Sequence, residues 1–312
     1  MSGERETGTL RLADLGEDEV VRRLTRGLPS GERVVAGPGE DDCAVIASSA
    51  EEELLLFKTD AVVRGVHYAE DVPPNLAGRK AMARCLSDIA AMGGRPSYAL
   101  TTVVLGRETP LARLEALYRG LREMAGEHGV LIVGGETSGA PRDAIGMEME
   151  MISVALLGTA NRDTLVRRSG GRAGDLLYVS GQLGRSYSNG RHLEFEPRLR
   201  EGRWLAEHGM ATAMIDLSDG LSRDLPRLAA ASGTGYNVEE SLLPRAAGAS
   251  VREALGDGED YELLFAAPPE RAKELEEGWQ RRFPEVPLTA IGRLCGLEEG
   301  RDLPKGGWDH FA

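Results

Sequence analysis

Short acidic motifs recur along the whole chain, and each has small or apolar neighbours. Because a carboxylate within an apolar segment is costly unless it is paired or bound to a metal, a fold that buries these segments must compensate their charges. Carboxylate oxygens suit hard divalent cations, and several cations gathered around phosphates suit phosphoryl transfer. The motifs begin at Glu40, Thr59, Leu86, Gly134, Asp216 and Gly258.

The composition describes a soluble globular protein with room for two cores, because the 312 residues are 41% hydrophobic and 28% charged. A net charge of -13 argues against nucleic acid as the main partner. The 3 cysteines are widely spaced and form no disulfide or zinc pattern, which fits a reducing cytoplasm. The N-terminus is polar, and no apolar run approaches the roughly 20 residues of a membrane span. We therefore expect a cytoplasmic protein that binds neither nucleic acid nor membrane.

Helical and strand patterns mix in both halves of the chain, which predicts two α+β domains, at residues 1–158 and 159–312. The segment 181–201 is polar and glycine-containing and has no clear pattern, and 204–208 reads as a short helix. Helices are predicted over 16–28, 75–92, 111–128, 220–232 and 271–283. Strands are predicted over 43–47, 54–63, 98–105, 130–133, 145–157, 175–180, 213–215, 262–267 and 287–293.

Three acids in the first half are candidates for cation binding. Asp42 precedes an apolar strand, where paired carboxylates can bridge two cations, although a surface turn also explains the pair. Asp60 ends an apolar strand, so its charge needs a partner or a metal. Asp88 lies on an apolar helix face, and either a cation or an ion pair with Arg84 or Lys80 would compensate it.

Two glycine-containing motifs are candidates for phosphate and metal binding. In Gly134–Thr137, predicted to be a loop after a short buried strand, glycines would let backbone N–H groups approach phosphates, although a plain turn is the alternative. No Walker loop occurs in the chain. In Asp216–Gly220, an extended backbone would point Asp216 and Ser218 the same way. Asp219 stands at a helix start, where it could hold a cation, cap the helix or do both.

Four further residues are weaker candidates. Arg168, in a small Arg-Ser-Gly loop, offers a cation for a nucleotide phosphate. His67 is a single histidine that could equally be structural or exposed. Glu259 stands in an acidic run that could simply be solvated. Trp308, in a C-terminal aromatic cluster, could tuck into a core or stack on a planar cationic ring.

In order and wording, these motifs resemble the thiamine-monophosphate kinase family of the aminoimidazole-ribotide-synthetase superfamily, over about residues 14–311. The most specific segments are Leu86–Gly93, Asp216–Gly220, Gly258–Leu263 and Trp308–Phe311. The resemblance implies a two-domain α+β fold and a homodimer joined through the N-terminal domains. It also implies the use of ATP and Mg²⁺ to convert thiamine monophosphate into the diphosphate.

The resemblance also implies roles for individual residues. Because the acceptor phosphate is already ionised near neutral pH, we expect direct in-line transfer without a phospho-enzyme. ATP would be bound by Gly135, Glu136, Arg168 and Ser218, and thiamine monophosphate by His67, Glu259 and Trp308. Magnesium would be bound by Asp42, Thr59, Asp60, Asp88, Asp216, Asp219 and Glu136, where the family has an aspartate at the last position.

The chain departs from the family pattern at three places. Glu136 carries one more methylene than the usual aspartate, and Glu40 stands where glycine is usual. The segment 181–190, which includes Arg185, replaces a small-residue stretch and a longer helical segment that border the nucleotide site. Two other functions therefore stay open: a sibling ATP-dependent enzyme with another substrate, or a catalytically degenerate protein that binds thiamine phosphate or nucleotide.

Overall fold

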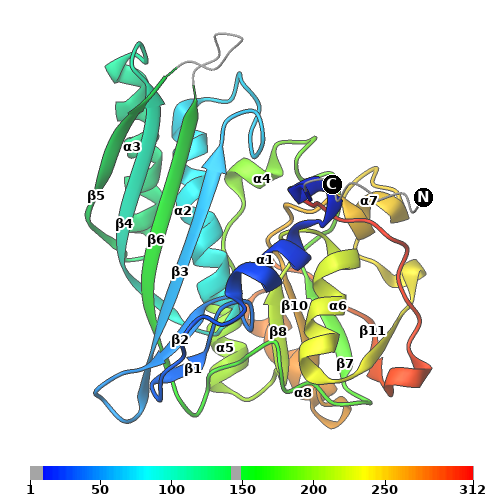
Figure 1. Cartoon of the computed structure of the whole chain (residues 1–312). Helices are drawn as coiled ribbons and strands as arrows, with labels where there is room; N and C mark the ends of the chain where they lie inside the picture. Colours follow the sequence, from blue (N-terminus) through cyan, green and yellow to red (C-terminus); the bar gives the residue numbers. More distant parts are fainter. Residues whose placement is uncertain (1–9, 142–148, 312) are drawn as a thin grey trace, which may run out of the picture.

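A computed structural model of the chain describes residues 10–141 and 149–311. It contains two β-sheets that lie side by side, and helices pack on both (Figure 1). This arrangement confirms the predicted α+β fold. Among the described residues, no helix combines the length and the apolar character that a membrane crossing needs.

The N-terminal sheet has six strands in the order β1-β2-β3-β6-β4-β5. Its neighbouring strands are antiparallel except β4 and β5, which are parallel because the helix α3 carries the chain back between them. The strands are β1 (Val34–Ala36), β2 (Ala44–Ala47), β3 (Glu53–Val63), β4 (Arg95–Gly106), β5 (Leu131–Ala140) and β6 (Glu150–Asn161).

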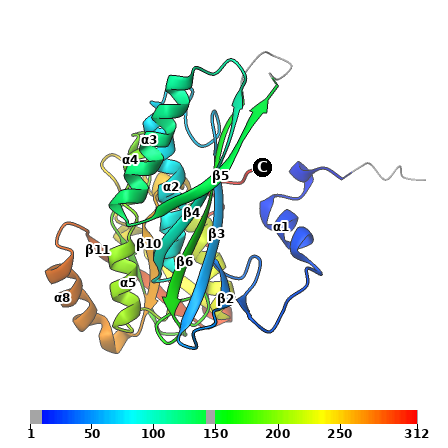
Figure 2. The same cartoon turned by 90° about the vertical axis from the view of Figure 1, so that its left-hand side faces the viewer.

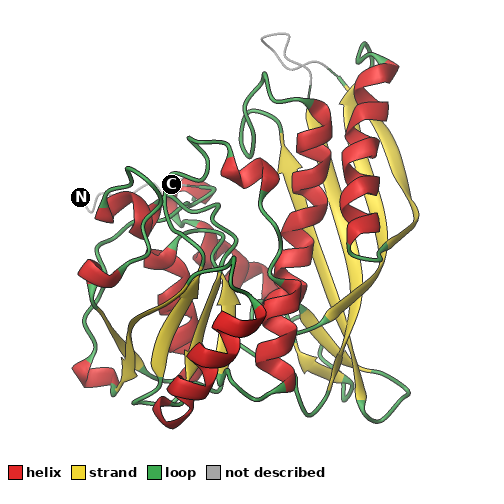
Figure 3. Ribbon diagram, turned by 180° about the vertical axis from the view of Figure 1, so that it is seen from behind, coloured by secondary structure: helices red, strands yellow, loops and turns green. Residues whose placement is uncertain are grey.

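The helices α2 (Pro74–Ala91) and α3 (Leu111–Glu127) cover one face of this sheet (Figure 2). Their backbones pack closely at two glycines. A Cβ on Gly78 would lie 1.9 Å from the carbonyl oxygen of Leu117, and one on Gly120 would lie 1.8 Å from that of Asn75. Helix α2 is buried along most of its length because it contacts the sheet, α3 and the second domain together (Figure 3).

The opposite face of the N-terminal sheet, called the open face here, carries half-exposed apolar side chains. Side chains alternate along a strand, so the residues of β3 and β4 that do not contact α2 point to this face. They include Phe57, Tyr98 and Leu100, with Leu131 and Val133 of β5 next to them, all between 45% and 61% exposed.

The C-terminal sheet has five antiparallel strands in the order β8-β10-β7-β11-β9. Strand β10 is buried on both faces: Phe265 joins the core shared with α2, whereas Leu264 and Ala266 join a second core that includes residues of α6. The strands are β7 (Leu176–Ser180), β8 (Ala213–Asp216), β9 (Gly235–Val238), β10 (Leu263–Ala267) and β11 (Leu288–Cys295). The other helices are α1 (Glu17–Thr25), α4 (Arg191–Glu194), α5 (Leu199–Glu207), α6 (Leu221–Ser232), α7 (Val251–Gly256) and α8 (Ala272–Arg282).

The structure corrects the sequence interpretation in two segments. The residues Gly134–Thr137 do not form a loop after a short buried strand; they continue β5, which pairs with β4 and is mostly exposed. The unassigned segment 181–201 contains α4 and the start of α5, and α5 begins before the short helix predicted over 204–208. The first part of the strand predicted over 145–157 lies outside the described residues, and β6 begins at Glu150.

Candidate phosphoryl-transfer site

Three buried carboxylates from distant parts of the sequence meet between the two domains. Asp42 precedes β2, Asp88 lies on α2, and Asp216 ends β8. One oxygen atom of each lies within 4.8 Å of one oxygen atom of each of the others. The fold thus brings together three of the predicted magnesium ligands in one acidic cluster.

The electrostatics of this acidic cluster favour a bound cation. Burial and the neighbouring charge of Asp42 raise the pKa of Asp216 to about 6, although Ser87 donates a hydrogen bond of 2.6 Å to its carboxylate. Burial also raises the pKa of Asp88 well above its usual range. One carboxylate oxygen of Asp42 is buried and has no hydrogen-bond partner among the described residues. Oxygen donors with an unpartnered buried atom fit a divalent cation such as Mg²⁺.

Basic side chains surround the acidic cluster. The ammonium of Lys58 lies 2.5 Å from the carboxylate of Asp88 and 4.0 Å from that of Asp60. The guanidinium of Arg84 lies 3.7 Å from Asp60. Burial opposes ionisation of Asp60, but these two positive charges outweigh it and lower its pKa. Lys58, rather than Arg84 or Lys80, is therefore the ion-pair partner of Asp88.

Arg168 and Asp219 also take part in ion pairs beside the cluster. Arg168 lies 2.5 Å from Asp42, and Arg227 lies 2.6 Å from Asp219. The start of α6 is capped by Asp224, whose carboxylate accepts hydrogen bonds from the backbone N–H groups of Asp219 and Gly220. The alternative interpretation of Asp219 as the helix cap is therefore wrong.

A cavity of about 1100 Å³ opens onto the acidic cluster. Its wall includes one face of α1, and Asp18 of this helix forms ion pairs of 2.9 and 2.8 Å with Arg223 and Arg227 of α6. Predicted site residues that line the cavity are Asp42, Asp60, Asp88, Arg168, Asp216, Ser218 and Asp219. The volume is large enough for a nucleotide-sized ligand.

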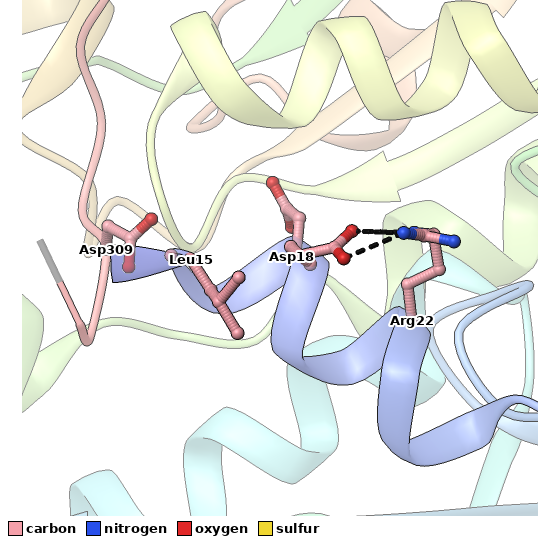
Figure 4. Close-up of a pocket in the computed structure, with 6 residues that line it drawn as sticks. Leu15, Asp18, Arg22 and Asp309 are labelled. Carbon is pink, nitrogen blue, oxygen red and sulfur yellow. Dashed lines mark hydrogen bonds and ion pairs between the residues drawn. The ribbon is translucent and has the colours of Figure 1, made fainter. Parts of the chain in front are cut away.

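A smaller cavity of about 340 Å³ lies at the N-terminal end of α1, where the C-terminal segment reaches it. Figure 4 shows Asp309 beside Leu15, with Asp18 and Arg22 further along the helix. The carboxylate of Asp309 accepts a hydrogen bond of 3.2 Å from the backbone N–H of Glu17. The C-terminal segment therefore holds α1 in place next to the larger cavity.

Three predicted residues lie away from the acidic cluster. Thr59 points to the face of β3 opposite Asp60. Glu136 of β5 pairs with Thr102 of β4, and both point to the open face. Strands β6 and β4 lie between β3 and β5, so Glu136 is about 15 Å from β3 across the sheet. Gly135 points the other way, and a Cβ there would lie 1.9 Å from the carbonyl oxygen of Thr101. Within one chain, the structure does not bring Thr59 or Glu136 to the acidic cluster.

The predicted substrate residues form a connected set of contacts. The ring of Trp308 lies 5.8 Å from that of His310, which lies 5.2 Å from that of His67. The ammonium of Lys80 donates a hydrogen bond of 2.5 Å to the backbone carbonyl of His67, and it forms an ion pair with Glu259. Trp308 is 46% exposed, so it does not tuck into the core.

Lys80 and His192 have a place in this site that the sequence interpretation missed. The side chain of Lys80 is fully buried, and its ammonium lies 2.7 Å from Nδ1 of His192. Burial opposes ionisation of Glu259, but the hydrogen bond with His192 and the charges of Lys80 and Arg84 lower its pKa to about 2. A lysine within the mostly small and apolar residues of α2 was the available signal, because such a charge requires a buried partner.

Comparison with known proteins identifies the family. The models of the AIR synthase related protein N-terminal and C-terminal domains match residues 40–160 and 164–299. The chain is 37% identical to thiamine-monophosphate kinase of Rhodopirellula baltica, over 88% of this chain and 87% of the relative. It is 31% identical to that of Salmonella typhimurium, over 94% and 97%. The chain belongs to the thiamine-monophosphate kinase family.

Solved structures agree with this family and its fold. The structure described as AaThiL complexed with AMPPCP and TMP is 28% identical with a TM-score of 0.82, over 97% of this chain and all of that one. The protein tt0281 from Thermus thermophilus is 28% identical with a TM-score of 0.74, over 95% and 100%. The hydrogenase maturation protein HypE of E. coli, at 21% identity and a TM-score of 0.67, over 89% and 92%, shares the fold.

Proposed function

We propose that the chain transfers the γ-phosphoryl group of ATP to thiamine monophosphate, with several Mg²⁺ ions bound at the acidic cluster. The observation that carries the proposal is the meeting of Asp42, Asp88 and Asp216 at one cavity in a member of this family. A related structure is described as a complex with AMPPCP and TMP, which supports the same pair of substrates.

The acidic cluster and its surroundings would hold the nucleotide. Asp42, Asp60, Asp88, Asp216 and Asp219 would supply the oxygen ligands. When bound, Mg²⁺ would neutralise phosphate charge and align the reacting groups. Arg168 and Ser218 line the same cavity and would contact phosphate oxygens. The ion pairs of Lys58 with Asp88 and of Arg168 with Asp42 would have to rearrange when these ligands bind.

The connected residues His67, Glu259 and Trp308 would hold thiamine monophosphate beside this cavity. His310 lines the cavity and contacts the rings of both His67 and Trp308, so it joins the two regions. The acceptor phosphate is mostly ionised at neutral pH and needs no strong general base. The principal barrier is repulsion between two anions, which positive groups relieve, and we therefore propose direct in-line attack without a phospho-enzyme.

A homodimer through the N-terminal sheets fits the exposed surface of the molecule. The open face carries the apolar side chains of Phe57, Tyr98, Leu100, Leu131 and Val133, a kind of surface that often marks a protein interface. Glu136 and Thr59 point to the same face, so they could serve a cation site only if a second copy of the chain brings one there. We propose the dimer on this basis.

Phosphorus NMR of the purified protein with ATP, Mg²⁺ and thiamine monophosphate tests the proposal. Thiamine diphosphate formed together with an equal amount of ADP is the expected result. Turnover of ATP only with another acceptor would favour a sibling enzyme. Binding of both ligands without turnover would favour a degenerate binding protein. A covalent phospho-enzyme on the pathway would exclude direct transfer.

A further inference from the structure

The segment 181–190, which departs from the family pattern, lies beside residues that are predicted to bind thiamine monophosphate. Tyr187 lies in the loop between β7 and α4, and its ring stacks on the ring of His192 at a centroid distance of 4.5 Å. The ammonium of Lys80 lies 5.9 Å from the centroid of the same ring. Among the described residues, none from 181–198 lines the cavity at the acidic cluster. The family pattern predicts that this segment borders the nucleotide site. In the structure, Tyr187 instead contacts His192 and Lys80, which both lie next to Glu259.

The ring of Tyr187 packs on the buried ring of His192 and is itself half-exposed. His192 is 3% exposed, and its Nδ1 lies 2.7 Å from the ammonium of Lys80 and 3.7 Å from the carboxylate of Glu259. Tyr187 itself is 41% exposed. A ring that packs on a buried imidazole while much of its surface faces solvent provides a flat platform for another ring.

The same loop that carries Glu259 holds the Tyr187 segment in place. The backbone N–H of Gly184 donates to the carboxylate of Asp260 at 3.0 Å, and Arg191 lies 2.5 Å from that carboxylate. The backbone N–H of Arg185 donates to Asp257 at 2.8 Å. Tyr187 and Glu259 are therefore positioned as one unit, although they are far apart in the sequence.

The backbone on both sides of this unit adopts an uncommon conformation. Arg185, Glu259 and Tyr261 have φ values of 61°, 60° and 52°, in the left-handed region that side chains other than glycine rarely occupy. Such conformations persist where the surrounding structure enforces them, and they are frequent at ligand-binding sites. Here they occur in the two loops that carry Tyr187 and Glu259.

The charges around Tyr187 suit a cationic ring. Burial, with help from Arg84, lowers the pKa of His67 to about 4, and burial also lowers that of His192, so both imidazoles are neutral at pH 7. Lys80 is fully buried and its charge is directed at Glu259, His192 and the carbonyl of His67. The carboxylate of Glu259, which is 17% exposed, and the half-exposed ring of Tyr187 are an anion and an aromatic surface of the kind that attracts a planar cation.

We propose that Tyr187 is a specificity-determining residue of the acceptor site and stacks on the cationic ring of the acceptor. The inference rests on the proposed function, because the thiazolium ring of thiamine monophosphate is the planar cation in question. Trp308 provides a second ring, which contacts His310 and through it His67. A simple phosphate monoester without such a ring would lose this contact.

The variants Tyr187→Ala, Tyr187→Leu and Tyr187→Phe test this role, with Leu297→Ala as a control. Tyr187 is half-exposed, so its truncation should leave the fold intact, and Leu297 is an exposed apolar residue in a 3-10 turn that contacts β9. Losing a ring that contacts a cation predicts a rise of about 3- to 30-fold in KM for thiamine monophosphate in the Ala and Leu variants. The KM for ATP and kcat should stay unchanged, and Tyr187→Phe and Leu297→Ala should resemble the unmodified chain.

Free thiamine carries the cationic ring but no phosphate, so inhibition by thiamine measures recognition of the ring alone. Its inhibition constant should rise in parallel with KM in the Ala and Leu variants. Unchanged KM for thiamine monophosphate in an active Tyr187→Ala variant would overturn the inference and leave the proposed function standing. A change confined to the KM for ATP, or a Tyr187→Phe variant as defective as Tyr187→Ala, would overturn it too. An unmodified chain that neither binds nor phosphorylates thiamine monophosphate would overturn both.

Discussion

The substitution Asp216→Asn should change stability and activity in opposite directions. The pKa of Asp216 rises from 3.8 to about 6 in the folded protein, first because of burial and then because of Asp42. A folded pKa above the unfolded one means that the ionised carboxylate costs stability, fully above pH 6 and not at all below about pH 4. The shift corresponds to about 3 kcal/mol at 25 °C.

Asparagine keeps the shape of this side chain and removes its charge. Its oxygen can still accept from Ser87, and the loss of its charge removes the repulsion with Asp42. In the ion-free protein at pH 8, we expect the free energy of unfolding to rise by about 1–3 kcal/mol. Most of the gain should disappear at pH 4, where the folded carboxylate is protonated and the unfolded one, with a pKa of 3.8, is only partly ionised. The loss of a cation ligand should lower kcat/KM by about 10²- to 10³-fold or more.

Urea unfolding in the presence of a chelator, at pH 8 and pH 4, measures the change in the free energy of unfolding. Steady-state kinetics measures the change in kcat/KM. Asp175→Asn is a matched control, because Asp175 is buried and accepts a hydrogen bond of 2.6 Å from Thr212 outside the cavity. The control should not be stabilised. If Asp216→Asn failed to stabilise the ion-free protein at pH 8, and so behaved like the control, the assignment of a repulsive acidic cluster would be refuted.

Three further expectations follow from the same structure. Asp60→Asn should lower activity far more than stability, and equal losses in kinetics and in thermal unfolding would exclude Asp60 as a cation ligand. Because Asp216 must lose its proton to bind a cation, the affinity for Mg²⁺ measured by calorimetry should fall about tenfold or more per pH unit below pH 6, and a flat profile would contradict this. Gly78→Ala should destabilise the protein by about 1–3 kcal/mol because its Cβ would meet the backbone of α3, whereas Gly126→Ala, with open space around it, should be neutral or stabilising; thermal unfolding of both compares them, and equal effects would refute the argument from close packing.

Much of the secondary structure could be predicted locally. The helix predicted over 75–92 is α2, and the strand predicted over 54–63 is β3, each within a residue or two of its observed ends. In both segments the apolar residues recur periodically over many positions, and this periodicity indicates which side of a helix or strand is buried. The acidic motifs in their particular order also sufficed to predict the family.

The segment Gly134–Thr137 shows where local reasoning fails. Two glycines followed by an acid read as a turn, because glycine is common in turns and weak in strands. In the structure, parallel pairing with β4 continues through them, and Gly135 is required there by the close carbonyl of Thr101. Pairing partners are distant in the sequence, so no local pattern could reveal this.

The residues that carry an unusual charge can be identified from the order of amino acids alone: they are acids at the ends of apolar segments and lysines within β3 and α2. Which of these charges meet depends on how the chain folds. It paired Asp88 with Lys58 and Glu259 with Lys80, and it placed Glu136 on the open face. The energy of a buried charge depends on distances of a few ångströms through space, and separation along the sequence does not fix those distances.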